Sequence, residues 1–485
     1  MRKIIVVLAP VALAVGLLFF SSYPGVTDDM GNAQAQTLAA KPNIVFIVTD
    51  DMRKDDMMYM PKTHSLLREQ GMGFRNAFVS NAICCPSRST IMRGQYSHNT
   101  GVWSNSSTDS PSTTIGGWQA YQENSNEADT VATRLQSAGY RTGLFGKYLN
   151  GYNNTEVPPG WDRWFAHVNG IDYYDYHIND DGTTRHYGST SADYETDVLA
   201  NQAKTFIGTS AEAGKPFFAY VAPYAPHLPA TPAPRDLHTY DGLKAPRPPS
   251  FNEKDATDKH SWIRQLPKLS DATKAKIDNQ HERRAESLQA VDDLVAAVVG
   301  TLKDKGVLSS TYIFFTSDNG WHEGEHRIQQ GKWRPYEEDI HMPLVVRGPG
   351  VAAGSTTYKM ALNTDYLPTF MDLAGAPIPP YVDGRSLMPI LDGSVTRWRS
   401  AILLEAAANH SQAYRGIRTV STNTITGRKY VEYAGGAREL YNLESDGYEL
   451  TNSYDATAPP TSLAMRLQAL KDCAAYTCRT AEPGA

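Results

Sequence analysis

Cysteine is scarce in this sequence, and positive charge is not in excess. The 485 residues include 4 cysteines, and 46 lysines and arginines against 52 aspartates and glutamates give a net charge of −6. Without a strong positive field there is no argument for nucleic acid binding, so an anionic ligand has to be met by a local pocket. Internal repeats are absent too, and beyond residue 20 no apolar run is long enough to cross a bilayer.

The N-terminus has the pattern of a targeting segment. Arg2 and Lys3 precede the apolar run Ile4–Phe20, and Ala33-Gln34-Ala35 offers a cleavage site. This order predicts that residues 1–40 are a signal peptide and a disordered leader, and that the protein is exported to a secreted, periplasmic or cell-surface location with no stable membrane span after cleavage. An uncleaved anchor is the alternative, because the run is near the lower length of a membrane span.

Four later apolar runs share one feature, a polar group just beyond the carboxyl end. Continuous apolar runs of this length are typical of parallel strands that are buried on both faces. In open α/β sheets, ligands bind outside the carboxyl ends of the strands, so the four runs should offer these polar groups to one rim. The runs and the residues beyond them are Asn43–Thr49 with Asp50 and Asp51, Thr142–Gly146 with Lys147, Phe217–Ala222 with His227, and Thr311–Ser317 with Asp318 and Asn319.

Helical patterns lie between these runs, which predicts an α/β fold with a large, mostly parallel sheet flanked by helices on both faces. Ala285–Leu302 carries apolar residues at intervals of three or four, as a packing helix does, and Tyr194–Phe206 is similar. Residues 150–190 and 230–272 are predicted to be long irregular loops, which form either substrate walls or a decorated surface.

The pattern changes after about residue 397. The segments beyond it are typical of three short antiparallel strands and one helix, at Ala401–Glu405, Tyr414–Val420, Lys429–Tyr433 and Ser462–Cys473. We therefore predict a large domain over residues 41–396 and a smaller C-terminal domain of antiparallel sheet plus helix over residues 397–485.

The most unusual stretch is residues 81–101, in which Cys84 and Cys85 are adjacent and precede Pro86-Ser87-Arg88. A disulfide between the two is strained, because neighbouring Cα atoms lie about 3.8 Å apart and a disulfide needs roughly 4.4–6.8 Å. Zinc is a poor fit, since the usual ligand spacing is missing. Two buried thiols remain possible, as does a reactive or chemically changed cysteine. Cys473 and Cys478 could close a small loop in an oxidising compartment.

The run Cys84-Cys85-Pro86-Ser87-Arg88 resembles the C-x-P-S-R signature of the sulfatases, formylglycine-dependent enzymes of the alkaline phosphatase superfamily. The longer form CCPSRSTIMRGQYSHN is similar to the N-acetylglucosamine-6-sulfatase branch, and the resemblance extends from about Lys41 to about Asn452. It implies an alkaline phosphatase-like fold, with residues 41–396 as the catalytic domain. It also implies that a formylglycine-generating enzyme oxidises Cys84 to formylglycine, an aldehyde that works as its hydrate.

Asp50, Asp51, Asp318 and Asn319 form an all-oxygen set of the kind that Ca²⁺ and Mg²⁺ bind. Adjacent carboxylates at a strand end repel each other without a cation between them. Taken alone, each pair would fit an ordinary turn or helix cap. The resemblance implies that these four positions, with the modified Cys84, hold one divalent ion, usually calcium, with magnesium as the alternative.

Positive groups accompany this set. Arg88 follows Cys84 by four residues, so a helix that starts at the motif would place both on one face. The resemblance implies that Arg88 steadies the hydrate and that Lys147 and Lys332 bind sulfate. It also implies that His227 contacts the sulfate and protonates the departing oxygen. A surface lysine is the alternative for both lysines, and it is the more serious alternative for Lys332.

One position departs from the family pattern. Many members carry a histidine two residues after the lysine that Lys147 matches, whereas this sequence has Leu149. The group that activates the hydrate is therefore open, with Asn150 or His322 as substitutes. His98 and His326 also lie near the motifs and are weaker candidates.

The predicted reaction is hydrolysis of a sulfate monoester, on a 6-sulfated glucosamine or another sulfated glycan, with small aryl sulfates as further substrates. A single general acid contributes about 10²–10⁴-fold, whereas enzymes reach roughly 10⁶–10¹⁷-fold, so the whole set of groups is needed. Three alternatives remain open: a phosphonate monoesterase or phosphodiesterase of the same superfamily, an unmodified protein that binds sulfated glycans, and a structural exported protein with inert thiols.

Overall fold

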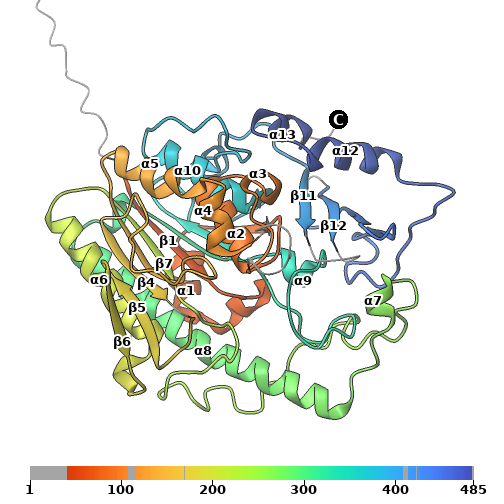
Figure 1. Ribbon diagram of the computed structural model, residues 1–485, viewed down its shortest axis with the longest axis horizontal. Coiled ribbons are helices and arrows are strands. Elements are labelled where there is room, and N and C mark those ends of the chain that lie inside the picture. The colour runs from red at the N-terminus through yellow and green to blue at the C-terminus, as the bar shows by residue number, and fades with distance from the viewer. Residues whose placement is uncertain (1–40, 107–115, 169, 408–412, 422, 483–485) are drawn as a thin grey trace, which may run out of the picture. The chain divides into compact units, whose positions relative to one another are not determined.

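The computed structural model describes residues 41–106, 116–168, 170–407, 413–421 and 423–482. The predicted signal peptide and leader lie outside these residues. A ten-stranded sheet, mixed but mostly parallel, has the strand order β10-β2-β9-β8-β1-β7-β3-β4-β5-β6 (Figure 1). The strands are β1 (Asn43–Thr49), β2 (Met72–Phe78), β3 (Arg141–Gly146), β4 (Arg163–Val168), β5 (Tyr176–Asp180), β6 (Thr183–Tyr187), β7 (Phe217–Ala222), β8 (Thr311–Ser317), β9 (Leu344–Arg347) and β10 (Ser355–Leu362).

The four predicted strands are neighbours at the centre of this sheet. β1 pairs in parallel with β8 on one side, where Thr49 lies opposite Ser317, and with β7 on the other side. β7 in turn pairs in parallel with β3, and Gly146 lies opposite Ala222. Parallel strands in this register end at the same edge, so their polar successors meet at one rim, as the sequence predicts.

Helices cover both faces of the sheet because each central strand buries both of its sides. Along β1, Phe46 belongs to the core under α2, α5 and α10, whereas Ile47 belongs to the core under α6 and α8 (Figure 1). The predicted large α/β sheet flanked by helices is thus confirmed. The covering helices are α2 (Cys84–Arg93), α5 (Val131–Ser137), α6 (Glu195–Glu212), α8 (Asp271–Asp304) and α10 (Tyr366–Leu373).

Both helices that the apolar spacing predicts are present, and both are longer than predicted. α8 starts well before the predicted segment because Ser270 caps it, with its hydroxyl accepting a hydrogen bond from the Thr273 backbone N–H at 3.2 Å. Shorter helices connect the layers at α1 (Pro61–Thr63), α3 (Ser97–Thr100), α4 (Gly117–Glu123), α7 (Ser261–Arg264), α9 (Glu337–Ile340) and α11 (Met388–Leu391). Within the described residues, no helix combines the length and apolar character that crossing a membrane requires.

The prediction that residues 150–190 are irregular was wrong, because β4, β5 and β6 lie there. β5 and β6 form a hairpin whose turn holds Asp181 and Gly182 at φ values of 49° and 92°. Asp-Gly is the preferred pair for such a turn, and it was the available signal. The second predicted loop is confirmed: from residue 230 to the start of α8, α7 is the one regular element.

A second sheet of four antiparallel strands follows in the chain, in the order β11-β12-β13-β14. Its buried residues, such as Ile402 and Ile417, pack with Leu467 of helix α12 (Thr461–Lys471). The predicted small antiparallel sheet plus helix is confirmed, and β14 is an additional strand. The strands are β11 (Ala401–Ala406), β12 (Tyr414–Thr419), β13 (Arg428–Tyr433) and β14 (Arg438–Asn442).

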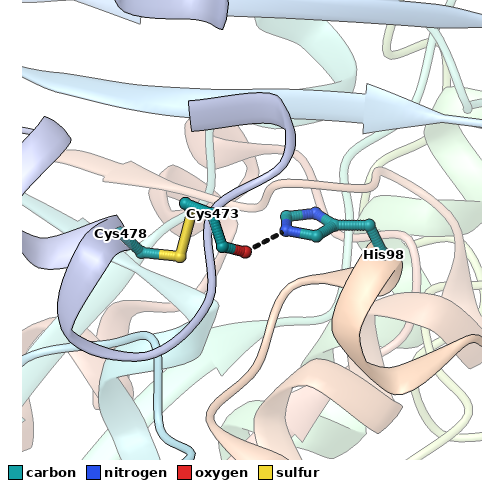
Figure 2. A group of neighbouring side chains, drawn as sticks. All are labelled: His98, Cys473 and Cys478. Carbon is teal, nitrogen blue, oxygen red and sulfur yellow. Dashed lines mark hydrogen bonds between the residues drawn. A yellow bond between two sulfur atoms is a disulfide. The ribbon is translucent and has the colours of Figure 1, made fainter. Parts of the chain in front are cut away.

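Cys473 and Cys478 form a disulfide between α12 and α13 (Tyr476–Ala481), as the sequence suggested they could (Figure 2). His98 contacts this segment through Nε2, which lies 2.7 Å from the Cys473 carbonyl oxygen (Figure 2). Its Nδ1 lies 2.9 Å from Glu405 Oε2. Although burial opposes it, the bonded Glu405 raises the pKa of His98, so both ring nitrogens can donate. His98 is therefore a structural residue that ties α3 to β11 and to the disulfide-bonded segment.

Candidate active site

The loops after four adjacent strands supply most of the predicted site. Asp50 and Asp51 follow β1, Asp318 and Asn319 follow β8, Lys147 follows β3, and His227 follows β7. Lys332 comes from the irregular segment between β8 and α9. Gly146 turns the chain at the end of β3 with a φ of 109°, where a side chain would lie 2.2 Å from the Ala222 carbonyl oxygen.

Cys84 and Arg88 lie in the first turns of α2 and point to the same rim, as their spacing predicts. Cys84 Sγ lies 3.4 Å from Asp50 Oδ1, and Arg88 Nε donates to Asp318 Oδ2 at 2.7 Å. Cys84 and Cys85 are both buried and unbridged. Burial, with the nearby Asp50 carboxylate, raises the pKa of the Cys84 thiol to about 12. As an unmodified thiol, Cys84 would be uncharged at neutral pH and a poor nucleophile.

We call Asp50, Asp51 and Asp318 the rim cluster. Their carboxylate oxygens and Cys84 Sγ lie within 4.8 Å of one another, and all four side chains are buried. Asn319 joins them by donating from Nδ2 to Asp51 Oδ1 at 2.5 Å. Asp51 Oδ2 and Asn319 Oδ1 are buried without a hydrogen-bond partner. Buried oxygens are normally satisfied, and an all-oxygen set with unfilled acceptors is what a hard divalent cation binds, so these residues fit such an ion.

Each carboxylate of the rim cluster also contacts a protein cation. Lys147 Nζ pairs with Asp50, Lys332 Nζ pairs with Asp51, and Arg88 pairs with Asp318. Lys332 Nζ in addition lies 2.8 Å from Cys84 Sγ. The alternative of surface lysines is therefore wrong for both, because the Lys147 and Lys332 side chains are only 2% and 12% exposed.

The charges within the rim cluster shift its pKa values in different directions. Burial alone would raise the pKa of Asp50, but Lys147, aided by His227 and Lys332, holds it well below the ordinary value. Burial and the neighbouring Asp50 raise the pKa of Asp318 in spite of Arg88.

His227 faces the rim cluster from the loop after β7. Its Nε2 lies 3.5 Å from Asp51 Oδ2, and its Nδ1 donates to the Leu228 carbonyl oxygen at 2.6 Å. The ring stacks on Tyr224 at a centroid distance of 4.6 Å. Burial lowers the pKa of His227. Because Nδ1 is engaged with a carbonyl, Nε2 is the nitrogen that can exchange a proton with a ligand.

A pocket of about 180 Å³ opens beside these groups, lined by Lys147, Asn150 and His227 together with aromatic and apolar side chains. Leu149 lines it too, so the position that departs from the family pattern faces the pocket. Asn150 Oδ1 is buried and has no hydrogen-bond partner. His322, the other possible substitute, is held by Asp339 at 2.6 Å and is not among the lining residues. Of the two substitutes, Asn150 is the one at the pocket.

Arg284 of α8 also belongs to the site, although it was not predicted from the sequence. Its Nη2 donates to the Asp51 carbonyl oxygen at 2.7 Å, and its Nη1 donates to the Pro226 carbonyl oxygen at 3.2 Å. Arg284 thus fixes both the loop that carries Asp51 and the loop that carries His227. It lies one turn before Leu288, on the buried side of the helix, so an arginine at the spacing of the apolar stripe was the signal that could have identified it.

Two family models match this chain. Residues 42–376 match the Sulfatase family model, and residues 324–472 match the model described as N-sulphoglucosamine sulphohydrolase, C-terminal. The human N-acetylglucosamine-6-sulfatase is 35% identical over 485 residues, which cover 91% of this chain and 86% of that protein. The Drosophila melanogaster extracellular sulfatase SULF-1 homolog is 36% identical over 383 residues, 77% of this chain, but the chain spans only 34% of that relative.

Solved structures extend the comparison. The structure of BT4656 in complex with its substrate D-glucosamine-2-N,6-O-disulfate has a TM-score of 0.73 at 25% identity, covering 88% of this chain and 97% of that one. The phosphonate monoester hydrolase of Agrobacterium radiobacter has a TM-score of 0.66 at 22% identity, covering 88% and 94%, and shares the fold. Since the Sulfatase model spans more than half of the chain, this protein belongs to the sulfatase family of sulfuric ester hydrolases.

Proposed function

We propose that this protein hydrolyses sulfate monoesters through a formylglycine made from Cys84, with one divalent cation, most simply Ca²⁺, held by Asp50, Asp51, Asp318 and Asn319. The observation that carries the proposal is the position of Cys84, whose Sγ lies within 4.8 Å of three buried carboxylates. The nearby amines of Lys147 and Lys332 and the guanidinium of Arg88 suit an anionic substrate. When present, the cation and the formylglycine hydrate supply the oxygen nucleophile at neutral pH.

The other residues act on the sulfate and on the departing alcohol. Lys147, which is buried, and Lys332, whose side chain is 12% exposed, neutralise charge on the sulfate oxygens as it builds up during attack on sulfur. Asp318 orients Arg88, whose Nη2 is buried without a partner and is free to hold the residue at position 84. His227 binds the ester oxygen through Nε2 and passes a proton from that atom to the departing alcohol.

We further propose a 6-sulfated glucosamine unit of a sulfated glycan as the natural substrate, with aryl sulfates as small surrogates. Support comes from relatives named N-acetylglucosamine-6-sulfatase and from the glucosamine disulfate named for BT4656. The pocket beside His227 has aromatic walls, including Tyr148, Tyr152 and Tyr224, which suit the apolar face of a sugar ring.

Export through residues 1–40 would place the enzyme where such glycans occur. N-terminal sequencing of the mature chain from the medium or periplasm tests this export.

The test uses the full chain, produced with and without a formylglycine-generating enzyme. Mass spectrometry of the Cys84 peptide should show loss of the thiol in the first preparation only. That preparation should release sulfate from 6-sulfated N-acetylglucosamine and from an aryl sulfate, and a chelator should abolish the release until Ca²⁺ is restored.

Two results contradict the proposal. Faster cleavage of an aryl phosphonate monoester than of either sulfate ester would assign the site to phosphonate chemistry. A modified, calcium-loaded protein that binds sulfated sugars but releases no sulfate would make it a glycan-binding homologue.

A further inference from the structure

A second group of carboxylates lies away from the rim cluster, where the loop after β7 meets α8. Glu282 and Glu286 are one helical turn apart on α8, and Asp241 approaches them from the loop. Oxygens from all three lie within 4.8 Å of one another. We call these residues the α8 cluster.

Glu286 is the unusual member of the α8 cluster, because it is buried and unpaired. Its side chain belongs to the interior, with the residue only 3% exposed. Its Oε1 is fully buried and has no hydrogen-bond partner, and among the described residues Glu286 makes no ion pair. Glutamate is almost never buried without a partner, because an ionised carboxylate loses its hydration there without compensation. The simplest way to balance the Glu286 carboxylate is a bound positive ion that supplies the missing charge.

The other two carboxylates are held in place by contacts that leave further oxygens free. Glu282 Oε2 accepts a hydrogen bond from the Gly242 backbone N–H at 2.9 Å. Asp241 Oδ1 lies 2.9 Å from Nδ1 of His238, whose side chain is 78% exposed. Each contact uses one oxygen of its carboxylate. Asp241, with Glu286 and Glu282 farther off, raises the pKa of His238, but the exposed imidazole pairs with Asp241 and not with Glu286.

We propose that Asp241, Glu282 and Glu286 bind a hard divalent cation, with Ca²⁺ as the representative ion. Three carboxylates and solvent supply an all-oxygen shell, which is the donor set that this class of cation takes. Asp241 and Glu282 are partly exposed, so water can complete the shell on the outer side. The inference rests on these contacts alone and does not depend on the proposed sulfatase mechanism.

Such a cation would tie the loop after β7 to α8, and that loop also carries His227. The turn of α8 that holds Glu282 and Glu286 also holds Arg284, which binds the Asp51 and Pro226 carbonyl oxygens. The α8 cluster and the rim cluster are thus connected through one helix. The cation's role is to fix the loop, and it takes no part in the reaction.

The experiment counts calcium on the full chain. After chelator treatment and dialysis, equilibrium binding of Ca²⁺ should give one more equivalent on the wild type than on Glu286→Gln, which keeps the size of the side chain and removes its charge. The affinity for that equivalent should fall by at least about 10-fold. Asp304→Asn, which removes an exposed carboxylate elsewhere on α8, should bind as the wild type does.

Thermal unfolding gives a second readout. Calcium should raise the melting temperature of the wild type and of Asp304→Asn more than that of Glu286→Gln. Asp241→Asn, at a side chain that is 65% exposed, gives the same comparison without touching the interior. Equal calcium stoichiometry and equal calcium-induced shifts in the wild type and both cluster variants would overturn the inference. If only a rim-cluster variant loses an equivalent of bound Ca²⁺, the proposal for the α8 cluster is unaffected. The two proposed sites can therefore be disproved independently.

Discussion

The rim cluster and the α8 cluster contain the same kind of side chain but differ in how the protein balances the charge. In the rim cluster, each of the three aspartates contacts a lysine or an arginine. In the α8 cluster, Glu286 contacts no cation of the described chain. Burial is similar for Asp50 and Glu286, so burial alone does not separate a reactive site from a structural one. The number and position of the lysine and arginine side chains separate the two kinds of site. A site for a substrate anion needs these cations, whereas a structural metal site does not.

The largest expected effect is on sulfate release, which depends on the residue beside the rim cluster and not on the α8 cluster. Cys84→Ser should lower sulfate release by about 10⁶-fold, the scale seen when a hydrolase loses its nucleophile. Serine fills the same space, but its single hydroxyl cannot become a hydrate that releases sulfate and regenerates itself. Initial-rate and single-turnover assays of sulfate release measure the loss.

The matched control is Cys85→Ser, one residue away and equally buried. It should keep modification at position 84 and turnover within about one order of magnitude, since Cys85 lies at the free position of the motif. Turnover by Cys84→Ser at a rate near that of the wild type would remove formylglycine from the mechanism.

His227→Asn is the next test of the rim cluster. Removal of a general acid should lower kcat by about 10²–10⁴-fold. The loss should be smaller for an aryl sulfate, whose leaving group needs less protonation, than for a sugar sulfate. His64→Asn, at an exposed histidine, is the control. A kcat unchanged on both substrates, with a raised KM, would make His227 a binding residue.

Lys147→Met should affect both catalysis and the stability of the fold. It should lower kcat/KM by about 10²–10³-fold, the usual cost of losing one group that stabilises developing charge. It should also lower the free energy of unfolding by about 3 kcal/mol, the lower end for breaking a buried ion pair, because Lys332 still acts on Asp50. Denaturant unfolding at neutral pH measures this, and Lys305→Met, on an exposed pair with Glu212, should change it little. An unchanged unfolding free energy would show that Lys147 does not balance Asp50.

Prediction from the sequence succeeded where one local pattern determined the outcome. The apolar runs that end before Asp50, Lys147 and Asp318 are strands near the centre of one sheet, and their continuous apolar character already required burial on both faces. The spacing of Cys84 and Arg88 likewise needs only a helix.

Prediction failed where polar residues act across long distances. Arg284 and Glu286 lie in a helix that its apolar spacing marked only as a packing helix. Their environment depends on loops that are tens to hundreds of residues away in the sequence. The β5–β6 hairpin was hidden by a composition typical of loops, although the turn residues Asp181 and Gly182 were visible. Lys332 has no strand or helix to place it, so only the family resemblance pointed to it.

The smallest expected effect has the opposite sign to the one expected for Lys147→Met. In the presence of a chelator, Glu286→Gln should raise the free energy of unfolding by about 1–3 kcal/mol, since a neutral amide costs less to bury than an unpaired carboxylate. At saturating Ca²⁺ the order should invert, because the wild type alone gains the binding energy of the ion. Parallel denaturant titrations of the wild type, Glu286→Gln and Asp304→Asn measure both signs. A decrease for Glu286→Gln under chelation would mean that the protein already balances Glu286, and the contrast between the two clusters would be lost. An increase together with the inversion would assign the missing charge to a bound cation.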